Sequence, residues 1–158
     1  MSPFPPVEEL LPHSAPMILI DELVAFDGEK AMGRVRLCDG SPFVQGGQVP
    51  ALVAIEYMAQ SIGLLTGIVS HGCGEPIQVG YLLGTRELTL AFDHFEVGDE
   101  LEVEVERLFG EAELGAFRCE VRRAGKIAAS AILNVYRNRD YVLPGRAPRT
   151  SIPTRQTP

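Results

Sequence analysis

The sequence contains few cysteines, and they follow no pattern that builds a site. Cys38, Cys73 and Cys119 are the only three, and they lie far apart in the chain. No C-x-x-C pair occurs and no histidine lies at ligand spacing from any of them. We therefore expect neither a disulfide framework nor a zinc site. Scattered thiols of this kind fit a reducing compartment.

Positive charge is scarce as well. The sequence has 14 lysines and arginines against 21 aspartates and glutamates, which gives a formal net charge of -7. No basic cluster appears before the C-terminal segment. Because a surface that follows nucleic-acid phosphates needs a basic stripe, we expect no nucleic-acid partner.

Targeting signals and cofactor motifs are also missing. The first residues, MSPFPPVEELLPH, contain no basic region followed by an apolar run, and no apolar run is long and uninterrupted enough to span a bilayer. The patterns G-x-S-x-G, G-x-x-x-x-G-K-[ST] and G-x-G-x-x-G are absent. We therefore expect a cytoplasmic protein with no membrane partner, no nucleotide or other cofactor, and no metal.

The sequence does contain the periodicities of one ordinary domain. Its 158 residues are 46% hydrophobic and 22% charged, which is typical of a soluble globular protein. Residues 17–37 predict a hairpin, because two alternating stretches flank the turn at Asp27 and Gly28. The nearly continuous apolar run over residues 49–69 predicts one long helix. Pro50 suits its first turn, and Gly72 and Gly74 close it.

Strand patterns follow this helix. Alternating segments joined by short turns predict an antiparallel sheet, with strands over residues 77–91, 99–109, 114–124 and 126–137. A helix that is apolar all round is a buried one, so the expected fold class is α+β, a hotdog fold in which an antiparallel sheet wraps around one long central helix. We expect an N-terminal arm over residues 1–9, the hotdog domain over 10–137, and a flexible tail rich in proline and arginine over 138–158.

One carboxylate interrupts the apolar helix. Glu56 lies in the middle of the run, and Gln60 follows one turn later on the same helix face, where it can hold the carboxylate by a hydrogen bond. A carboxyl group buried among apolar residues has its charged form disfavoured, which suits a general acid. A lone glutamate on such a helix can also be structural, bonded to a backbone N–H or facing a partner subunit.

Five stretches of the chain resemble, in order, the 3-hydroxyacyl-acyl-carrier-protein dehydratases of fatty-acid synthesis. They are LPHSAPMILID (11–21), SPFVQG (41–46), VPALVAIEYMAQ (49–60), YLLGTRELTL (81–90) and FEVGDELEVEV (95–105). The resemblance covers residues 10–137, and the E-x-M-A-Q block is its most specific part. The patterns PHxAPM and GGxVPAxxxIEYMAQ are most similar to the small dehydratase-like subunits of aryl-polyene pigment pathways.

The resemblance implies a dimer of hotdog subunits that acts on an acyl thioester of acyl-carrier protein or coenzyme A. The partner would be a second copy or a different hotdog subunit. In this family each site takes a histidine from one subunit and an acid from the helix of the other. Glu56 matches the helix acid, with Gln60 beside it. Substrate contacts are implied for Ala51 and Leu52, whose N–H groups at the helix start could reach the thioester oxygen, and for Tyr81, Leu83 and Gly84.

The sequence departs from this family at one important position. Gly47 stands where the catalytic histidine of the family is expected, and a few residues are missing before the helix. His13 falls in the LPHSAP block, where a histidine is expected to support the N-terminal turn, and His71 and His94 are expected at the surface.

Three interpretations therefore stay open. The chain could be a dehydratase subunit whose Glu56 works with a histidine from a different hotdog partner. It could be a non-catalytic hotdog subunit that binds an acyl chain or stabilises a partner. It could also be a hotdog thioesterase in which the helix carboxylate activates water. The E-Y-M-A-Q and PHxAPM blocks favour the dehydratase lineage.

Overall fold

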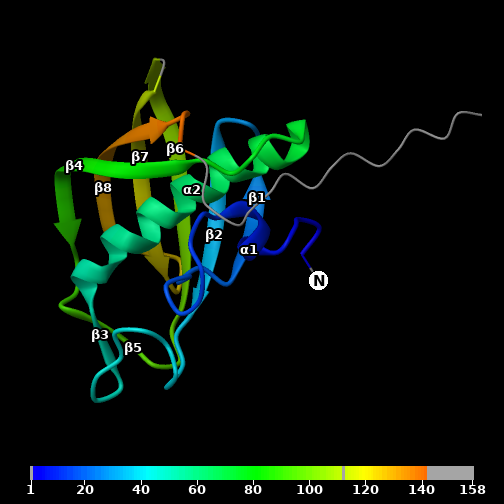
Figure 1. Cartoon of the computed structure of the whole chain (residues 1–158). Coiled ribbons are helices and arrows are strands. Elements are labelled where there is room, and N and C mark those ends of the chain that lie inside the picture. Colours follow the sequence, from blue (N-terminus) through cyan, green and yellow to red (C-terminus); the bar gives the residue numbers. More distant parts are fainter. Residues whose placement is uncertain (1, 112, 142–158) are drawn as a thin grey trace, which may run out of the picture.

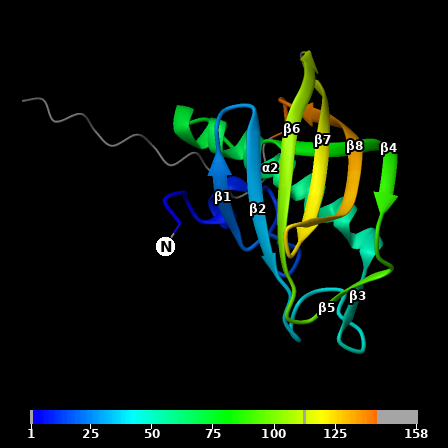
Figure 2. The same ribbon diagram turned by 180° about the vertical axis from the view of Figure 1, so that it is seen from behind.

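A single long helix lies in the curve of an antiparallel sheet. In the computed structural model, which describes residues 2–111 and 113–141, helix α2 (Ala54–Cys73) follows directly after a short 3-10 turn, η1 (Ala51–Val53). The helix crosses the concave face of the sheet, and the sheet curls around it (Figures 1 and 2). The predicted α+β hotdog fold is therefore confirmed.

The main sheet has six strands, and each pairs antiparallel with its neighbours. Their spatial order is β1 (Glu22–Phe26), β2 (Lys30–Arg36), β6 (Glu100–Glu111), β7 (Leu114–Arg123), β8 (Lys126–Asn138) and β4 (Val79–Leu90). These are the predicted hairpin and the four predicted later strands.

Two short strands, β3 (Gln48–Pro50) and β5 (His94–Glu96), form a separate antiparallel pair near the start of α2. The sequence analysis did not predict this pair, since three-residue strands are too short to produce a period-two pattern.

The N-terminal segment packs against α2. Helix α1 (Val7–Leu10) lies within the segment expected to be an arm, and its Val7 and Leu10 side chains are buried in the core. Gly67 of α2 permits this packing, because a Cβ at this position would overlap the carbonyl oxygen of Leu10. The expected C-terminal tail lies mostly outside the described residues.

Helix α2 ends where the sequence predicts. Gly74 adopts a left-handed conformation (φ 70°), and the N–H groups of Gly74 and Glu75 donate to the carbonyl oxygens of His71 and Ser70. Contrary to the expectation from the sequence, the segment Ala51–Cys73 is long and apolar enough to cross a membrane by length and composition alone, but half of its 18-residue apolar window is buried inside the domain. It is the core helix of this fold.

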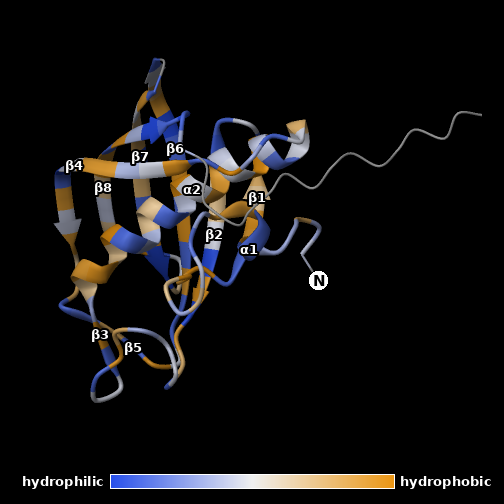
Figure 3. Cartoon of the chain, in the orientation of Figure 1, coloured by the Kyte–Doolittle hydropathy of each residue, from blue (hydrophilic) through white to orange (hydrophobic). Residues whose placement is uncertain are grey.

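The strands bury one face and expose the other, as Figure 3 shows by the alternation of hydrophobic and hydrophilic residues along them. In β6, Leu101, Val103 and Val105 are buried, and the intervening glutamates point outward. Arginines of the neighbouring strands pair with acids on this face; Arg34, for example, lies 3.7 Å from Glu102. The acidic stretch of β6 is thus an outward sheet face and not a site.

One buried thiol leads to a prediction about alkaline stability. Burial raises the pKa of Cys119 to about 12, whereas in the unfolded chain its value would be the ordinary 9.0. The folded state therefore holds a proton that the unfolded state loses above about pH 9. The free energy of unfolding should fall by about 1.4 kcal/mol per pH unit from about pH 9 upward.

Urea denaturation at about pH 8, 9 and 10 checks this expectation. Most of the slope with pH should disappear in Cys119→Ala and persist in Cys73→Ala, since Cys73 is exposed. Burial also raises the pKa of Tyr57 from its ordinary 10.0 to about 12, so Tyr57 adds a fall of about 0.4 kcal/mol at pH 10, well below the fall of about 1.4 kcal/mol from Cys119. An unchanged slope in Cys119→Ala would contradict the assignment.

Candidate active site

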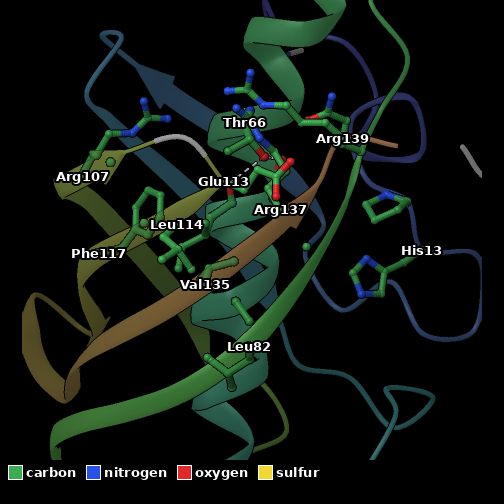
Figure 4. Close-up of a pocket in the computed structure, with 18 of the residues that line it drawn as sticks. His13, Thr66, Leu82, Arg107, Glu113, Leu114, Phe117, Val135, Arg137 and Arg139 are labelled. Atoms are coloured by element: carbon green, nitrogen blue, oxygen red, sulfur yellow. Dashed lines mark hydrogen bonds between the residues drawn. The ribbon is translucent and has the colours of Figure 1, made fainter. Parts of the chain in front are cut away.

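A cavity of about 350 Å³ lies between α2 and the sheet. Strands β4, β6, β7 and β8 form its wall on the sheet side, and the loop before β1 closes another side (Figure 4). The helix side chains that line it recur every three to four residues, so one helix face is turned toward the cavity. They belong to Glu56, Ala59, Ile62, Gly63 and Thr66.

Gln60 holds the Glu56 carboxylate, as predicted. The Nε2 group of Gln60 donates to Glu56 Oε1 at 2.8 Å and also to the carbonyl oxygen of Met17 at 2.8 Å. Its Oε1 atom accepts a hydrogen bond from the N–H of Leu19, again at 2.8 Å. The Gln60 side chain is fully buried. It therefore fixes the carboxylate and, through two backbone bonds, ties the loop before β1 to the helix.

This loop brings His13 to the carboxylate. His13 Nε2 lies 3.8 Å from Glu56 Oε1, and both side chains line the cavity. The sequence analysis expected His13 to support the N-terminal turn and did not place it beside Glu56. The spacing of the two residues in the sequence gives no sign of this contact. Their proximity comes from the hydrogen bonds that Gln60 makes to the backbone at Met17 and Leu19.

The expectation that Glu56 is buried is wrong for the single chain. Its side chain is 39% exposed and that of His13 is 35% exposed. The reason is that the helix face beside Glu56 has no cover from this chain. Burial of the carboxylate would need another molecule.

One of the two backbone donors expected at the helix start, the Ala51 N–H, is already bonded within the fold. The N–H of Ala51 donates to the carbonyl oxygen of Asp93 at 2.9 Å, so it is already used and does not serve as a donor to a thioester. This bond continues the β3–β5 pairing into the helix start. The Leu52 side chain is 57% exposed and lies on the outer surface.

On β4, the residues that line the cavity are Gly80 and Leu82, and the predicted Tyr81, Leu83 and Gly84 do not line it. Tyr81 instead stacks on Tyr136, with ring centroids 6.5 Å apart. Gly80 and Leu82 alternate as in a regular strand, and the register shifts only after Leu82, before Gly84.

Gly47 lies in a tight turn before β3. Gly46 and Gly47 both have positive φ angles, 60° and 75°, and Gln45 and Gln48 exchange two backbone hydrogen bonds across them. A two-residue turn of this kind favours glycine. The other two histidines are exposed, as expected: His71 lies 3.4 Å from Glu9, and His94 lies on β5.

Three arginines of the cavity were missed by the sequence analysis. Arg107, Arg137 and Arg139 lie at one end of the cavity, near Thr66 and Glu113 (Figure 4). A signal was present, because Arg107 is near the end of one predicted strand and Arg137 is at the end of another. Only the strand pairing brings those two ends together. Among residues 2–111 and 113–141, no group of three or more His, Cys, Asp or Glu side chains could hold a metal ion.

A curved antiparallel sheet around one long helix defines a hotdog protein, and in this one a helix carboxylate lies beside the cavity. The family model described as ApeP dehydratase matches residues 5–143, and the chain therefore belongs to the ApeP-like family.

Individual relatives agree with this assignment. The 3-hydroxyacyl-[acyl-carrier-protein] dehydratase FabZ of Neisseria meningitidis serogroup C is 28% identical over 80% of this chain and 88% of its own length. The same enzyme from Pectobacterium atrosepticum is 29% identical over 84% and 90%. Among solved structures, a chain of the dehydratase heterocomplex ApeI:P from Xenorhabdus doucetiae has a TM-score of 0.82 and 30% identity, over 87% of this chain and 93% of that chain.

A more distant structure shares the fold alone. A hypothetical thioesterase from Streptococcus pneumoniae, solved with coenzyme A, has a TM-score of 0.57 and 13% identity, over 74% of this chain and 84% of that chain.

Proposed function

We propose that this protein is one subunit of a heteromeric hotdog dehydratase that removes water from a 3-hydroxyacyl thioester. The observation that carries the proposal is the Glu56 carboxylate, held by Gln60 at the edge of an acyl-sized cavity. Membership in the ApeP-like family and the FabZ relatives support the reaction type.

The elimination needs three functions. A base removes the proton from the carbon next to the thioester carbonyl, an acid gives a proton to the departing hydroxyl, and donors stabilise the enolate-like oxygen. Glu56 in its protonated form serves as the acid, and its proton leaves with the hydroxyl as water. The product is the 2-enoyl thioester. Gln60 keeps the carboxyl group in one orientation, so the proton lies where the hydroxyl departs.

A histidine of a second hotdog subunit serves as the base. Gly47 stands at the position of the family histidine, and its turn geometry disfavours a side chain. His13 is close to Glu56 but contacts the same carboxylate that must act as the acid.

An uncovered surface beside Glu56 fits such a partner. Strand β4 is a sheet edge, and it carries the exposed apolar side chains of Leu82 and Leu83, the latter 60% exposed. Leu52 and Val69 of the helix segment are also exposed. A soluble protein rarely leaves both an unpaired edge and apolar side chains open to water. The similar chain in the ApeI:P structure belongs to a heterocomplex, which favours a different hotdog protein over a second copy.

The test compares the protein alone with the protein and its hotdog partner, recovered by copurification from the native host. With a 3-hydroxyacyl thioester on acyl-carrier protein, we expect dehydration by the pair to exceed that of the protein alone by about 10²- to 10⁴-fold, the usual contribution of a general base. Dehydration by the protein alone at the rate of the pair would overturn the heteromeric proposal. Loss of that activity in His13→Gln would then assign the base to His13.

Two other outcomes separate the remaining interpretations. Release of the free acid in place of the enoyl thioester would assign the chain to the thioesterases. Tight binding of the acyl thioester with neither reaction, alone or with the partner, would assign it a binding role.

A further inference from the structure

The end of the cavity away from Glu56 is lined by positive charge. Arg107 comes from β6, Arg137 from the end of β8, and Arg139 follows that strand; Figure 4 shows them near Thr66, with Leu82 at the opposite end of the view. Glu113, from the β6–β7 connection, is the acidic residue there. In a chain with a net charge of -7, three arginines around one cavity need an explanation.

These arginines differ from those of strands β2 and β7. Arg34, Arg36, Arg118, Arg122 and Arg123 each lie within ion-pair distance of a carboxylate. Within the part of the chain that the structure describes, Arg107 and Arg137 form no such ion pair. The guanidinium of Arg107 lies 5.8 Å from the centre of the Phe117 ring. Glu113 attracts Arg137, but its effect on the pKa of Arg137 is smaller than the opposing effects of burial, Arg139 and Arg107.

The electrostatics of Arg137 favour the binding of an anion. Burial, and then the positive charges of Arg139 and Arg107, hold the pKa of Arg137 below its ordinary value. Like charges gathered in a partly desolvated place are unfavourable, and an anion bound between them would reverse the sign of the interaction.

The middle of the cavity is apolar. Glu56 and Thr66 are ten residues apart on one helix, which separates them by about 15 Å along its axis. Between these levels the helix contributes Ala59 and Ile62, and the sheet contributes Leu82 and Val135. The Thr66 hydroxyl bonds the carbonyl oxygens of its own helix. A hydrocarbon chain fits this stretch, whereas buried amide groups would lack partners there.

We propose that the cavity accepts an acyl chain whose far end carries an anionic group such as a carboxylate, bound by Arg107 and Arg137 while the thioester lies at Glu56. This inference rests on the proposed function, since it takes the Glu56 end as the thioester end. The phosphate of a phosphopantetheine arm could also bring an anion to arginines. The apolar middle disfavours that source, because the arm carries two amides.

The test measures binding and not turnover. Two pantetheine thioesters of equal length are compared by calorimetry with the full chain, alone and with its hotdog partner. One carries a straight acyl chain that spans about 15 Å, and the other carries the same chain with a terminal carboxylate. Neither contains phosphate, so a difference in affinity reports the acyl end alone. We expect the carboxylate compound to bind about 10- to 100-fold more tightly, the usual effect of a charge-assisted hydrogen bond.

Matched variants locate the effect. Arg137→Gln and Arg107→Gln should each remove most of the preference for the carboxylate, and both retain a polar side chain of similar length. Arg118→Gln is the control, since Arg118 pairs with Glu106 and does not line the cavity. Equal affinities of the two compounds for the unaltered protein would overturn the inference, as would a preference that persists in both variants.

A third compound tests the competing source of the anion. If an acyl-phosphopantetheine binds more tightly than the corresponding acyl-pantetheine, and Arg137→Gln removes that gain, the arginines bind the carrier arm and the inference is wrong. Dehydration of a neutral 3-hydroxyacyl thioester by the unaltered complex is measured separately. It tests the proposed function whether or not the anion position exists.

Discussion

Replacement of Glu56 by glutamine should lower kcat of the assembled dehydratase by about 10²- to 10⁴-fold while leaving the fold intact. Glutamine has the size of glutamate, and its carbonyl oxygen can still accept the hydrogen bond from Gln60 Nε2, now 2.8 Å long. It has no proton to give to the departing hydroxyl. The loss should therefore appear in kcat, with an unchanged melting temperature and little change in binding of the acyl thioester.

Glu9→Gln is a suitable control for this experiment. Glu9 lies 3.4 Å from His71 and its side chain has similar exposure to that of Glu56, but the pair does not line the cavity. Its replacement should leave kcat unaltered. Full activity of Glu56→Gln in the presence of the partner would show that the carboxyl group is not the acid.

The largest effect on stability should come from Gly67→Ala. A Cβ at this position would overlap the carbonyl oxygen, carbonyl carbon and Cα of Leu10. These are backbone atoms, so no rotation of a side chain can relieve the overlap, and α1 would have to move away from α2. Leu10 and Val7 would then lose part of their burial. We expect a loss of about 3 kcal/mol or more, at the upper end of the cost of overpacking.

Alanine substitutions at two other glycines of α2 serve as comparisons for Gly67→Ala. Gly63→Ala would place a Cβ 2.8 Å from the Cδ2 atom of Leu11, a side-chain atom that can move, so the cost should be smaller. Gly72→Ala meets no atom within 4 Å and should stabilise the helix by up to about 1 kcal/mol, because alanine has the higher helix propensity. Denaturation by urea gives all three values. Equal stability of Gly67→Ala and Gly72→Ala would contradict the close packing of α1 on α2.

Local sequence patterns were sufficient for the layers of the fold. Strict alternation in β6 predicts a strand with one buried face, and Leu101, Val103 and Val105 are indeed buried. The apolar run before Gly74 predicts the core helix. The bond between Gln60 and Glu56 was predictable as well, since residues four apart on a helix always lie on one face. Each of these features depends on residues that are near in the chain.

Features that join distant segments were not predictable. His13 reaches Glu56 only because Gln60 binds the backbone at Met17 and Leu19. Gly80 and Leu82 line the cavity as alternate residues of β4, but the pairing with β8 shifts after Leu82, and Gly84 does not line the cavity; no period-two pattern reveals that shift. The exposed fraction of Glu56 likewise depends on whether another molecule covers its helix face. No described segment of this chain does so.

The sequence by itself determined the hotdog layers, the helix carboxylate and its glutamine, because helix and strand periods act over a few neighbouring residues. Only the tertiary structure decided that His13 faces Glu56, that the Ala51 N–H is used by Asp93, and that arginines from β6 and β8 meet around one cavity. Those proximities follow from strand register and from hydrogen bonds between loops and the helix. Contacts between residues far apart in the chain produce no periodic pattern in the sequence, so the sequence alone does not predict them.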